Sequence, residues 1–295
     1  MVLGGQGVPL SESPDVLLTN DDGVDAPGLR VVAEALAPVA SLTVVAPAND
    51  QSGAGRTYNR SVTVHEHDPE PALARVVDDC WVVEGTPVDC VNVARGRVQT
   101  AFDAVVAGCN DGPNLGAHKL GQSGTVGAAR QAAFFGSPGV AVSVYDPPTG
   151  VRAFEPADYR AAGRVAREVI TRLPDDGFPA GVDHLNCNVP AAPAPTAVAD
   201  PTGWCVTEPL HDADVTMVPD DEHGGDAGGD EGSEYPDDTP VAGDYRLFDH
   251  FYDPLIPDNG VDADDPPTTD RGAIARECVS ASPLSVDGAA GDTEA

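Results

Sequence analysis

The stretch Asp15-Val-Leu-Leu-Thr-Asn-Asp21-Asp22-Gly-Val-Asp-Ala-Pro-Gly28-Leu29 decides the fold expected for this chain. Its short apolar run, Val16–Leu18, is bounded by polar residues and predicts a buried strand. Pro27 occupies a typical first helical position, and apolar residues then recur at helical spacing up to Leu36. The stretch therefore indicates a strand, a tight turn and a helix, which is the repeating unit of an α/β fold.

The turn in this stretch carries Asn20, Asp21 and Asp22 in succession, followed by Gly23. Open α/β sheets bind ligands at the carboxyl ends of their strands, and two adjacent carboxylates there suit a hard divalent cation. Asn-Asp-Asp-Gly is also ordinary turn chemistry with no functional meaning. On this stretch alone both interpretations stay open.

The alternation of short apolar runs with helical periodicity continues to about residue 190. Further strands are expected at 42–46, 61–66, 81–84, 104–108, 139–144 and 184–189, and further helices at 87–94, 123–135 and 157–173. Such alternation predicts an α/β fold with a doubly wound, mostly parallel sheet.

The organisation of the chain follows from shifts in composition. We expect a loose N-terminus at 1–13, an α/β domain at 14–190, a C-terminal extension at 191–284 and a loose tail at 285–295. Residues 212–238 hold eleven acidic residues and neither Lys nor Arg, which indicates an acidic, insertion-like and mobile segment. Regular structure is expected again at 244–248 and within 269–284.

The charge balance is unusual. Asp and Glu total 48 against 16 Lys and Arg, the net charge is -32, and Lys119 is the only lysine. The strongly negative electrostatic field of such a chain repels nucleic-acid backbones. We therefore expect no binding to a nucleic-acid duplex. Dispersed acidic residues with almost no lysine indicate a halophilic protein of a high-salt cytoplasm, which should lose structure when salt is removed. A melting temperature that is the same at low and molar salt would contradict this.

Two classes of protein are disfavoured by what the sequence lacks. No apolar run approaches the roughly 20 residues of a membrane span, and the N-terminus has no signal-peptide pattern, so we expect a cytoplasmic protein without membrane contact. The six cysteines form no CxxC pair, which argues against a zinc ribbon or a redox motif and favours reduced thiols.

Unusual polar residues follow three of the expected strands: Asn20-Asp21-Asp22, the loop around Ser52, and Asn110 with Asn114. The exits of parallel strands share one edge of the sheet, so these residues can converge. Carboxylate, hydroxyl and amide oxygens suit Mg²⁺ or Mn²⁺ better than zinc. Ser123-Gly124-Thr125 opens a helix, whose free N–H groups and dipole favour a phosphate. A predicted metal site beside a predicted phosphate site indicates an enzyme that acts on phosphoryl groups.

Each of these features also has a purely structural interpretation. Ser123 can merely cap its helix, the glycines around Ser52 can serve a turn, and Asn110 and Asn114 tolerate left-handed backbone. Their joint placement after consecutive strands favours the functional interpretation.

Five ordered motifs resemble the SurE family of metal-dependent nucleoside-monophosphate phosphatases. They are Thr19-Asn-Asp-Asp-Gly-Val-Asp-Ala-Pro-Gly28, Val45-Ala-Pro-Ala-Asn-Asp-Gln-Ser52-Gly, Gly85-Thr-Pro-Val-Asp-Cys90, Gly108-Cys-Asn-Asp-Gly-Pro-Asn-Leu-Gly116 and Ser123-Gly-Thr-Val-Gly-Ala-Ala129. The similarity resumes at Leu185–Pro190 and Thr269–Leu284. It thus covers most of residues 15–284.

The resemblance implies a Rossmann-like catalytic domain, a C-terminal extension exchanged between subunits, and homodimers or homotetramers. It implies one divalent metal ion per subunit, Mg²⁺ or Mn²⁺, with ligands at Asp21, Asp22, Ser52 and Asn110. It also implies phosphate binding at Asn114, Ser123, Gly124 and Thr125. The chain departs from the family at Gln122, a position that is often Tyr, so base preference is not carried over.

The function expected is a metal-dependent phosphoric monoester hydrolase, a 5′-nucleotidase that cleaves nucleoside 5′-monophosphates to nucleoside and phosphate. Asp21 or Asp22 would orient or deprotonate the attacking water as the catalytic group. Two alternatives stay open: a broader 3′-nucleotidase or exopolyphosphatase at the same site, and a non-catalytic nucleotide- or metal-binding protein. A haloacid-dehalogenase-type phosphatase lacks its DxDxT here, and a dinucleotide-binding oxidoreductase lacks its GxGxxG after the first strand.

Overall fold

The computed structural model describes residues 13–146, 153–176, 178–191, 203–212, 215–219, 245–249, 251 and 265–286. Its main feature is a nine-stranded sheet in the order β3-β4-β2-β1-β5-β6-β7-β11-β8. The strands are β1 (Asp15–Thr19), β2 (Ser41–Pro47), β3 (Thr63–Glu66), β4 (Asp79–Glu84), β5 (Ala104–Asp111), β6 (Gly139–Tyr145), β7 (His184–Pro190), β8 (Trp204–Val206) and β11 (Val279–Leu284).

The six central strands, β4-β2-β1-β5-β6-β7, are all parallel to their neighbours. Counted along the chain their order is 3-2-1-4-5-6, which is the order of the Rossmann fold. β3 and β11 add antiparallel neighbours at either side, and β8 runs parallel to β11. The predicted doubly wound, mostly parallel sheet is therefore confirmed.

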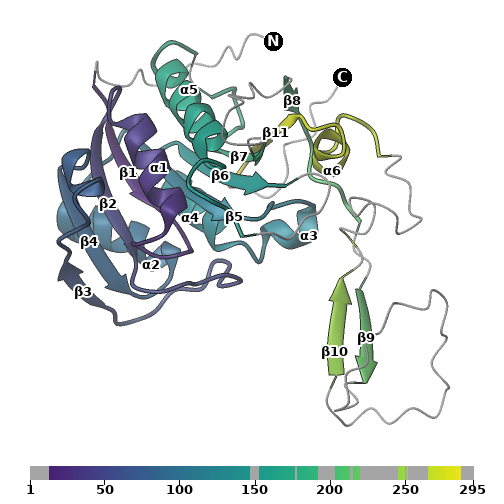
Figure 1. Cartoon of the computed structure of the whole chain (residues 1–295), viewed down its shortest axis with the longest axis horizontal. Coiled ribbons are helices and arrows are strands. Elements are labelled where there is room, and N and C mark those ends of the chain that lie inside the picture. The colour runs from purple at the N-terminus through teal and green to yellow at the C-terminus, as the bar shows by residue number, and fades with distance from the viewer. Residues whose placement is uncertain are drawn as a thin grey trace.

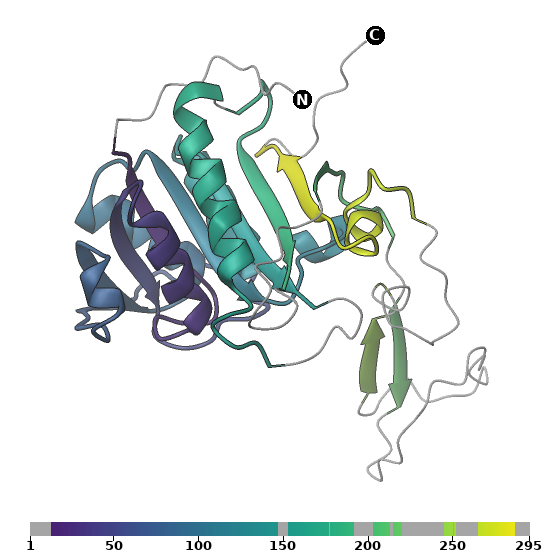
Figure 2. The ribbon, with the colours of Figure 1, turned by 45° about the horizontal axis from the view of Figure 1, so that its top comes forward.

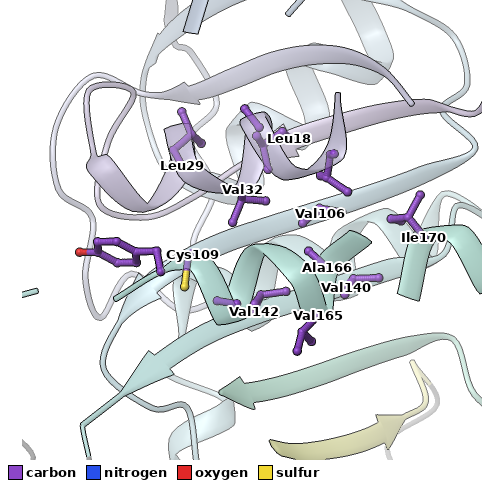
Figure 3. Packing of buried hydrophobic residues seen from close by; sticks show 14 of the residues in the cluster. Leu18, Leu29, Val32, Val106, Cys109, Val140, Val142, Val165, Ala166 and Ile170 are labelled. Carbon is purple, nitrogen blue, oxygen red and sulfur yellow. The ribbon is translucent and has the colours of Figure 1, made fainter. Parts of the chain in front are cut away.

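Helices cover both faces of the sheet (Figures 1 and 2). They are α1 (Pro27–Leu36), α2 (Pro87–Val93), α3 (Ala117–Leu120), α4 (Gly124–Phe134), α5 (Arg160–Asp176) and α6 (Asp270–Ile274), with a 3-10 turn at Leu73–Arg75 and a π-helical turn at Ala94–Val98. α1 and α5 pack on one face with Leu18, Val106 and Val140 beneath them (Figure 3). α2 and α4 pack on the other face over Leu17 and Val105.

Local sequence explains where these helices begin. Pro27 and Pro87 each occupy the first turn of a helix, where the missing N–H costs no hydrogen bond. Thr86 and Asp89 form a reciprocal capping box at the start of α2, and Ser123 caps α4 by accepting from the N–H of Val126. Proline and capping residues thus define the starts of α1, α2 and α4.

The C-terminal part returns to the main sheet. β11 lies beside β7, and α6 directly precedes it. A separate hairpin of β9 (Val215–Pro219) and β10 (Tyr245–Asp249) lies away from the main sheet (Figure 1). β9 falls within the acidic 212–238 segment that was expected to lack regular structure, because Val, Thr, Met and Val in succession favour a strand. Residues 220–238 lie outside the described residues, as do 1–12 and 287–295.

Two further observations concern the described residues as a whole. Among them, no helix is both long and apolar enough to cross a membrane. All six cysteines belong to the described part of the chain and are free. Burial raises the thiol pKa of Cys80 to about 12 and that of Cys187 to about 12, so these side chains act as small apolar groups.

Candidate metal and phosphate site

The expected site lies where the order of the parallel strands reverses, between β1 and β5. Asp21 and Asp22 directly follow β1, and Asn110 lies near the end of β5. In doubly wound sheets this switch point leaves a crevice at the carboxyl ends of the strands, where ligands bind. The fold therefore places both groups of residues at the edge predicted from the sequence.

Asp21 is a buried carboxylate, only 3% exposed, that contacts the start of α4. Thr125 donates to it twice, from its hydroxyl to Oδ1 at 2.6 Å and from its N–H to Oδ2 at 3.2 Å. A Cβ on Gly124 would stand 3.0 Å from Asp21 Oδ2, so glycine permits this close approach. Burial raises the pKa of Asp21, and the hydrogen bonds from Thr125 offset part of the rise.

Asp22 has an oxygen that lacks a partner. Its Oδ2 atom is buried and accepts no hydrogen bond within the described part of the chain. Burial first, and then the negative charges of Asp21, Asp111 and Asp50, raise the pKa of Asp22 to about 8. Such an environment disfavours the ionised carboxylate unless a cation is bound beside it.

The other two expected metal ligands come from the loops that follow β2 and β5. The N–H of Gln51 donates to the carbonyl of Asp21 at 2.7 Å and holds the Ser52 loop against the β1 exit. The Ser52 hydroxyl is exposed and donates to Asp50 Oδ1 at 2.6 Å. Asn110 donates from Nδ2 to the carbonyl of Gly112, so its Oδ1 atom is the one that could accept or coordinate.

The donor set fits Mg²⁺ or Mn²⁺ better than a His- or Cys-bound metal. Within the described ranges, no group of three or more His, Cys, Asp or Glu side chains is placed to hold a metal ion. A metal at this edge would therefore need a hydroxyl and an amide oxygen beside the two carboxylates, and hard cations accept such ligands. The unpartnered Oδ2 of Asp22 is the observation that favours a cation here.

The residues expected to bind phosphate divide into two groups. At the start of α4, Ser123 Oγ accepts from the N–H of Val126 at 3.1 Å, so the hydroxyl proton of Ser123 remains free to donate. The hydroxyl proton of Thr125 is already given to Asp21, so Thr125 links the helix start to the carboxylate. Asn114 instead bonds to β6, with Nδ2 donating to Ser143 Oγ at 2.9 Å.

The comparisons with known proteins agree with this architecture. The sequence profile of the family described as "Survival protein SurE" matches residues 16–212. The chain belongs to the SurE family. It is 39% identical over 277 residues to the "5'-nucleotidase SurE" of Natronomonas pharaonis, covering 92% of each chain. It is 41% identical over 280 residues to that of Haloarcula marismortui, covering 92% of this chain and 89% of the relative.

A solved structure is similar along nearly the whole length. The crystal structure of a SurE protein from Aquifex aeolicus has a TM-score of 0.68 and 25% sequence identity, and the match covers 93% of this chain and 94% of that one. The haloarchaeal relatives also fit the halophilic composition, since they share the high-salt origin expected from a net charge of -32.

In this member of the SurE family, residues outside the expected set complete the site edge. Tyr159, at the start of α5, donates from its hydroxyl to Asp111 Oδ1 at 2.6 Å. Asp111 follows the predicted ligand Asn110 and contributes negative charge at Asp22. Sequence spacing gave no sign of this pair, because the two residues lie 48 positions apart.

Two asparagines of β7 hold the Asn114 backbone. Asn188 accepts from the N–H of Asn114 at 2.7 Å, and Asn186 donates to its carbonyl at 2.8 Å. Both side chains are fully buried. One sequence signal could have identified them, because asparagine is depleted in strands and Asn-Cys-Asn stands in the middle of one.

Proposed function

We propose that the chain is a metal-dependent phosphatase that hydrolyses nucleoside 5′-monophosphates to nucleoside and phosphate. The observation that carries the proposal is the buried Asp21–Asp22 pair at the switch point, with one unpartnered oxygen and with the start of α4 hydrogen-bonded to it. The names of the haloarchaeal relatives support the same reaction class. Metal identity and the choice of nucleotide are part of the proposal.

We assign the metal to Asp21, Asp22, Ser52 and Asn110, with one Mg²⁺ or Mn²⁺ per subunit. When bound, such an ion polarises a phosphoryl oxygen and lowers the pKa of a water molecule. The carboxylates of Asp21 and Asp22 carry the ligand charge that this requires. Thr125 fixes the orientation of Asp21 through two hydrogen bonds, so that carboxylate needs little reorganisation during the reaction.

The chain's own groups would bind and orient the phosphate. Ser123 offers its hydroxyl proton, and Gly124 offers an N–H at the positive end of α4. Asn114, clamped by Asn186 and Asn188, offers the remaining proton of its amide. Asp21 or Asp22 would accept the proton of the attacking water, and no covalent intermediate is required.

The decisive experiment measures phosphate release from 5′-AMP and 5′-GMP with Mn²⁺ in molar salt. Asp21→Asn should lower the rate by about a thousandfold or more, since it removes one ligand charge while its oxygen still accepts from Thr125. Asp25→Asn is the matched control, because Asp25 lies in the same loop with its side chain 84% exposed. It should keep the parental rate.

Three outcomes of this experiment discriminate among the functions. Full activity of Asp21→Asn contradicts the site assignment. Nucleotide binding without phosphate release by the parent protein favours a binding protein over an enzyme. Comparable rates on 5′-AMP, 3′-AMP and polyphosphate favour the broader phosphatase.

We further propose that the protein forms homodimers or homotetramers in which the C-terminal extension is exchanged. The extension carries exposed apolar side chains on β9, with Val215 47% and Met217 49% exposed, on a hairpin that lies away from the main sheet (Figure 2). Apolar side chains on a projecting hairpin favour burial against a second copy. Light scattering in molar salt tests this, and a monomeric mass contradicts it.

A further inference from the structure

A cavity lies on the side of α4. It has a volume of about 520 Å³ and is bordered by α4, the start of β7, the end of β11 and residues 208–211. Arg56, Arg130 and His184 line it together with apolar side chains. None of the residues assigned to the metal or phosphate lines this cavity, so it is a separate feature of the molecule.

Two arginines face this cavity with no acidic partner. Arg56 and Arg130 lie over the same Phe134 ring, with guanidinium carbons 4.9 Å and 5.9 Å from its centroid. Burial and the charge of Arg130 lower the pKa of Arg56. Neither arginine has a salt bridge to any residue in the described part of the chain.

This lack of ion pairs is unexpected in so acidic a chain. The sequence has 48 acidic residues for 16 basic ones, so a partner for an arginine is abundant. Arg130 does donate from one terminal nitrogen to the carbonyl of Val286 at 2.8 Å, but its buried Nε atom has no partner. Two arginines kept together against their mutual repulsion indicate a place for an external anion.

His184 adds an unpartnered hydrogen-bonding group to the same cavity. Its side chain is 2% exposed, and its buried Nδ1 atom has no hydrogen-bond partner among the described residues. Burial, with the charges of Arg130 and Arg56, lowers its pKa to about 4, so the ring is neutral at pH 7. The neighbouring Asp183 already accepts from Ser285 Oγ and the N–H of Val286.

The charge and shape of the cavity define the ligand class. Among the described residues Glu208 is the one carboxylate that lines it, so with Arg56 and Arg130 the lining carries a net positive charge. Leu120, Val126 and Leu284 form an apolar wall. A cavity of this volume is within the usual range for small-molecule sites, and guanidinium groups bind phosphate in a bidentate manner.

We propose that this cavity is a second binding site, distinct from the Asp21–Asp22 edge, for a small organic phosphate. The phosphate group lies between Arg56 and Arg130, the His184 ring supplies a hydrogen bond, and the organic part lies against the apolar wall. The site needs no metal, because the arginines supply the positive charge. AMP is also the substrate proposed for the Asp21–Asp22 edge, so the loss of affinity in Arg56→Gln, and not AMP binding by the parent alone, assigns the ligand to this cavity.

The test is calorimetric titration of 5′-AMP into chelator-treated, full-length protein in molar KCl, with adenosine as the uncharged counterpart. We expect AMP to bind at least tenfold more tightly than adenosine. Arg56→Gln should weaken AMP binding at least tenfold, since it removes one guanidinium group from the phosphate. Arg95→Gln is the matched control, because Arg95 also lies over a phenylalanine ring, Phe135 at 4.8 Å, but does not line the cavity.

Every alternative result overturns the proposal. If the Arg56→Gln and Arg95→Gln variants bind AMP with equal affinity, the phosphate group binds outside this cavity. Absence of AMP binding to the parent protein removes the site. If Arg56→Gln changes the molar mass by light scattering but leaves AMP affinity unchanged, the cavity is a contact between copies of the chain. Arg130→Gln provides a second variant, with equal thermal melting of each variant and its parent as the check on folding.

Discussion

Asp270 is a fully buried carboxyl group and Asp22 is a half-buried one whose Oδ2 atom is buried, and their surroundings are opposite. Asp270, the first residue of α6, is fully buried and accepts from the N–H groups of Gly116, Leu210 and Arg271 at 2.7, 3.0 and 2.8 Å. Burial raises its pKa, and these N–H groups offset part of the rise. Asp22 has an oxygen without a partner among the described residues, and burial first, then three negative neighbours, raise its pKa to about 8.

The difference separates a structural carboxylate from the one that we propose as a metal ligand. Asp270 connects three segments that are far apart in sequence, since its partners lie up to 154 positions away. Both of its oxygens accept hydrogen bonds from backbone N–H groups. Asp22 keeps one buried oxygen without a partner among the described residues, which is the arrangement expected of a carboxylate that binds a cation. Burial alone therefore does not identify a functional acid; the unfilled hydrogen-bonding capacity does.

The largest effect on stability is expected for Asp270→Ala. The change leaves three buried N–H groups without an acceptor, and each such group costs about 1–3 kcal/mol. We expect the free energy of unfolding to fall by about 4 kcal/mol, measured by urea denaturation in molar salt. Asp25→Ala is the control at an exposed site and should change it by less than about 0.5 kcal/mol. A loss below about 1 kcal/mol for Asp270→Ala would show that Asp270 is not structural.

His184 extends the comparison to a buried base whose Nδ1 lacks a partner. Because its folded pKa is about 4 and its unfolded value is 6.5, the unfolded chain binds the proton first as pH falls. The contribution of neutral His184 to the free energy of unfolding is thus fully present above pH 6.5. It is lost progressively toward pH 4, by up to about 3 kcal/mol. His184→Gln should remove this part of the slope, as followed by urea midpoints at several pH values. An unchanged slope in His184→Gln would contradict the assignment.

Asp22→Asn should stabilise the metal-free protein, in contrast to any change at Asp270. A carboxyl whose folded pKa is raised weakens folding progressively as pH rises from about 4 to about 8, because the unfolded chain ionises first. The gain for Asp22→Asn should reach about 2 kcal/mol at pH 8, after allowance for solvent at this partly exposed edge, and vanish near pH 4. Urea denaturation with chelator at both pH values measures it. Lower stability of Asp22→Asn at pH 8 would remove the contrast with Asp270.

One part of the candidate site was predictable from the sequence. The β1 strand, its acidic turn and the helix start at Pro27 follow from local patterns, namely a short apolar run, turn residues and a proline. The order of strands and helices then gives a parallel sheet, and that topology places Asn110 beside Asp21. Local chemistry and topology together were therefore enough to predict the edge of the site.

The partners of each side chain were not predictable, because they depend on long-range packing. Thr125 donates to Asp21 across 104 positions, and Asp270 meets Gly116 across 154, so no spacing rule connects them. β8 has only three residues and gains its pairing from β11. Residues 117–120, which belong to none of the expected helices or strands, form the single turn of α3. These features need the tertiary structure, which decides short elements more than propensity does.

The smallest effect is expected for Tyr159→Phe, which would make Asp111 more like Asp22. The Tyr159 hydroxyl is the donor that lowers the pKa of Asp111 against the effect of burial, and its removal leaves the ring packing near Phe154 in place. We expect a loss of about 1 kcal/mol in the free energy of unfolding at pH 8. Tyr58→Phe, at a residue 66% exposed, is the control and should be neutral. An unpartnered Asp111 would be protonated more readily, so the loss of unfolding free energy from Tyr159→Phe should shrink at lower pH. A loss that is equal at pH 4 and pH 8 would mean that the hydroxyl does not act through the Asp111 carboxylate.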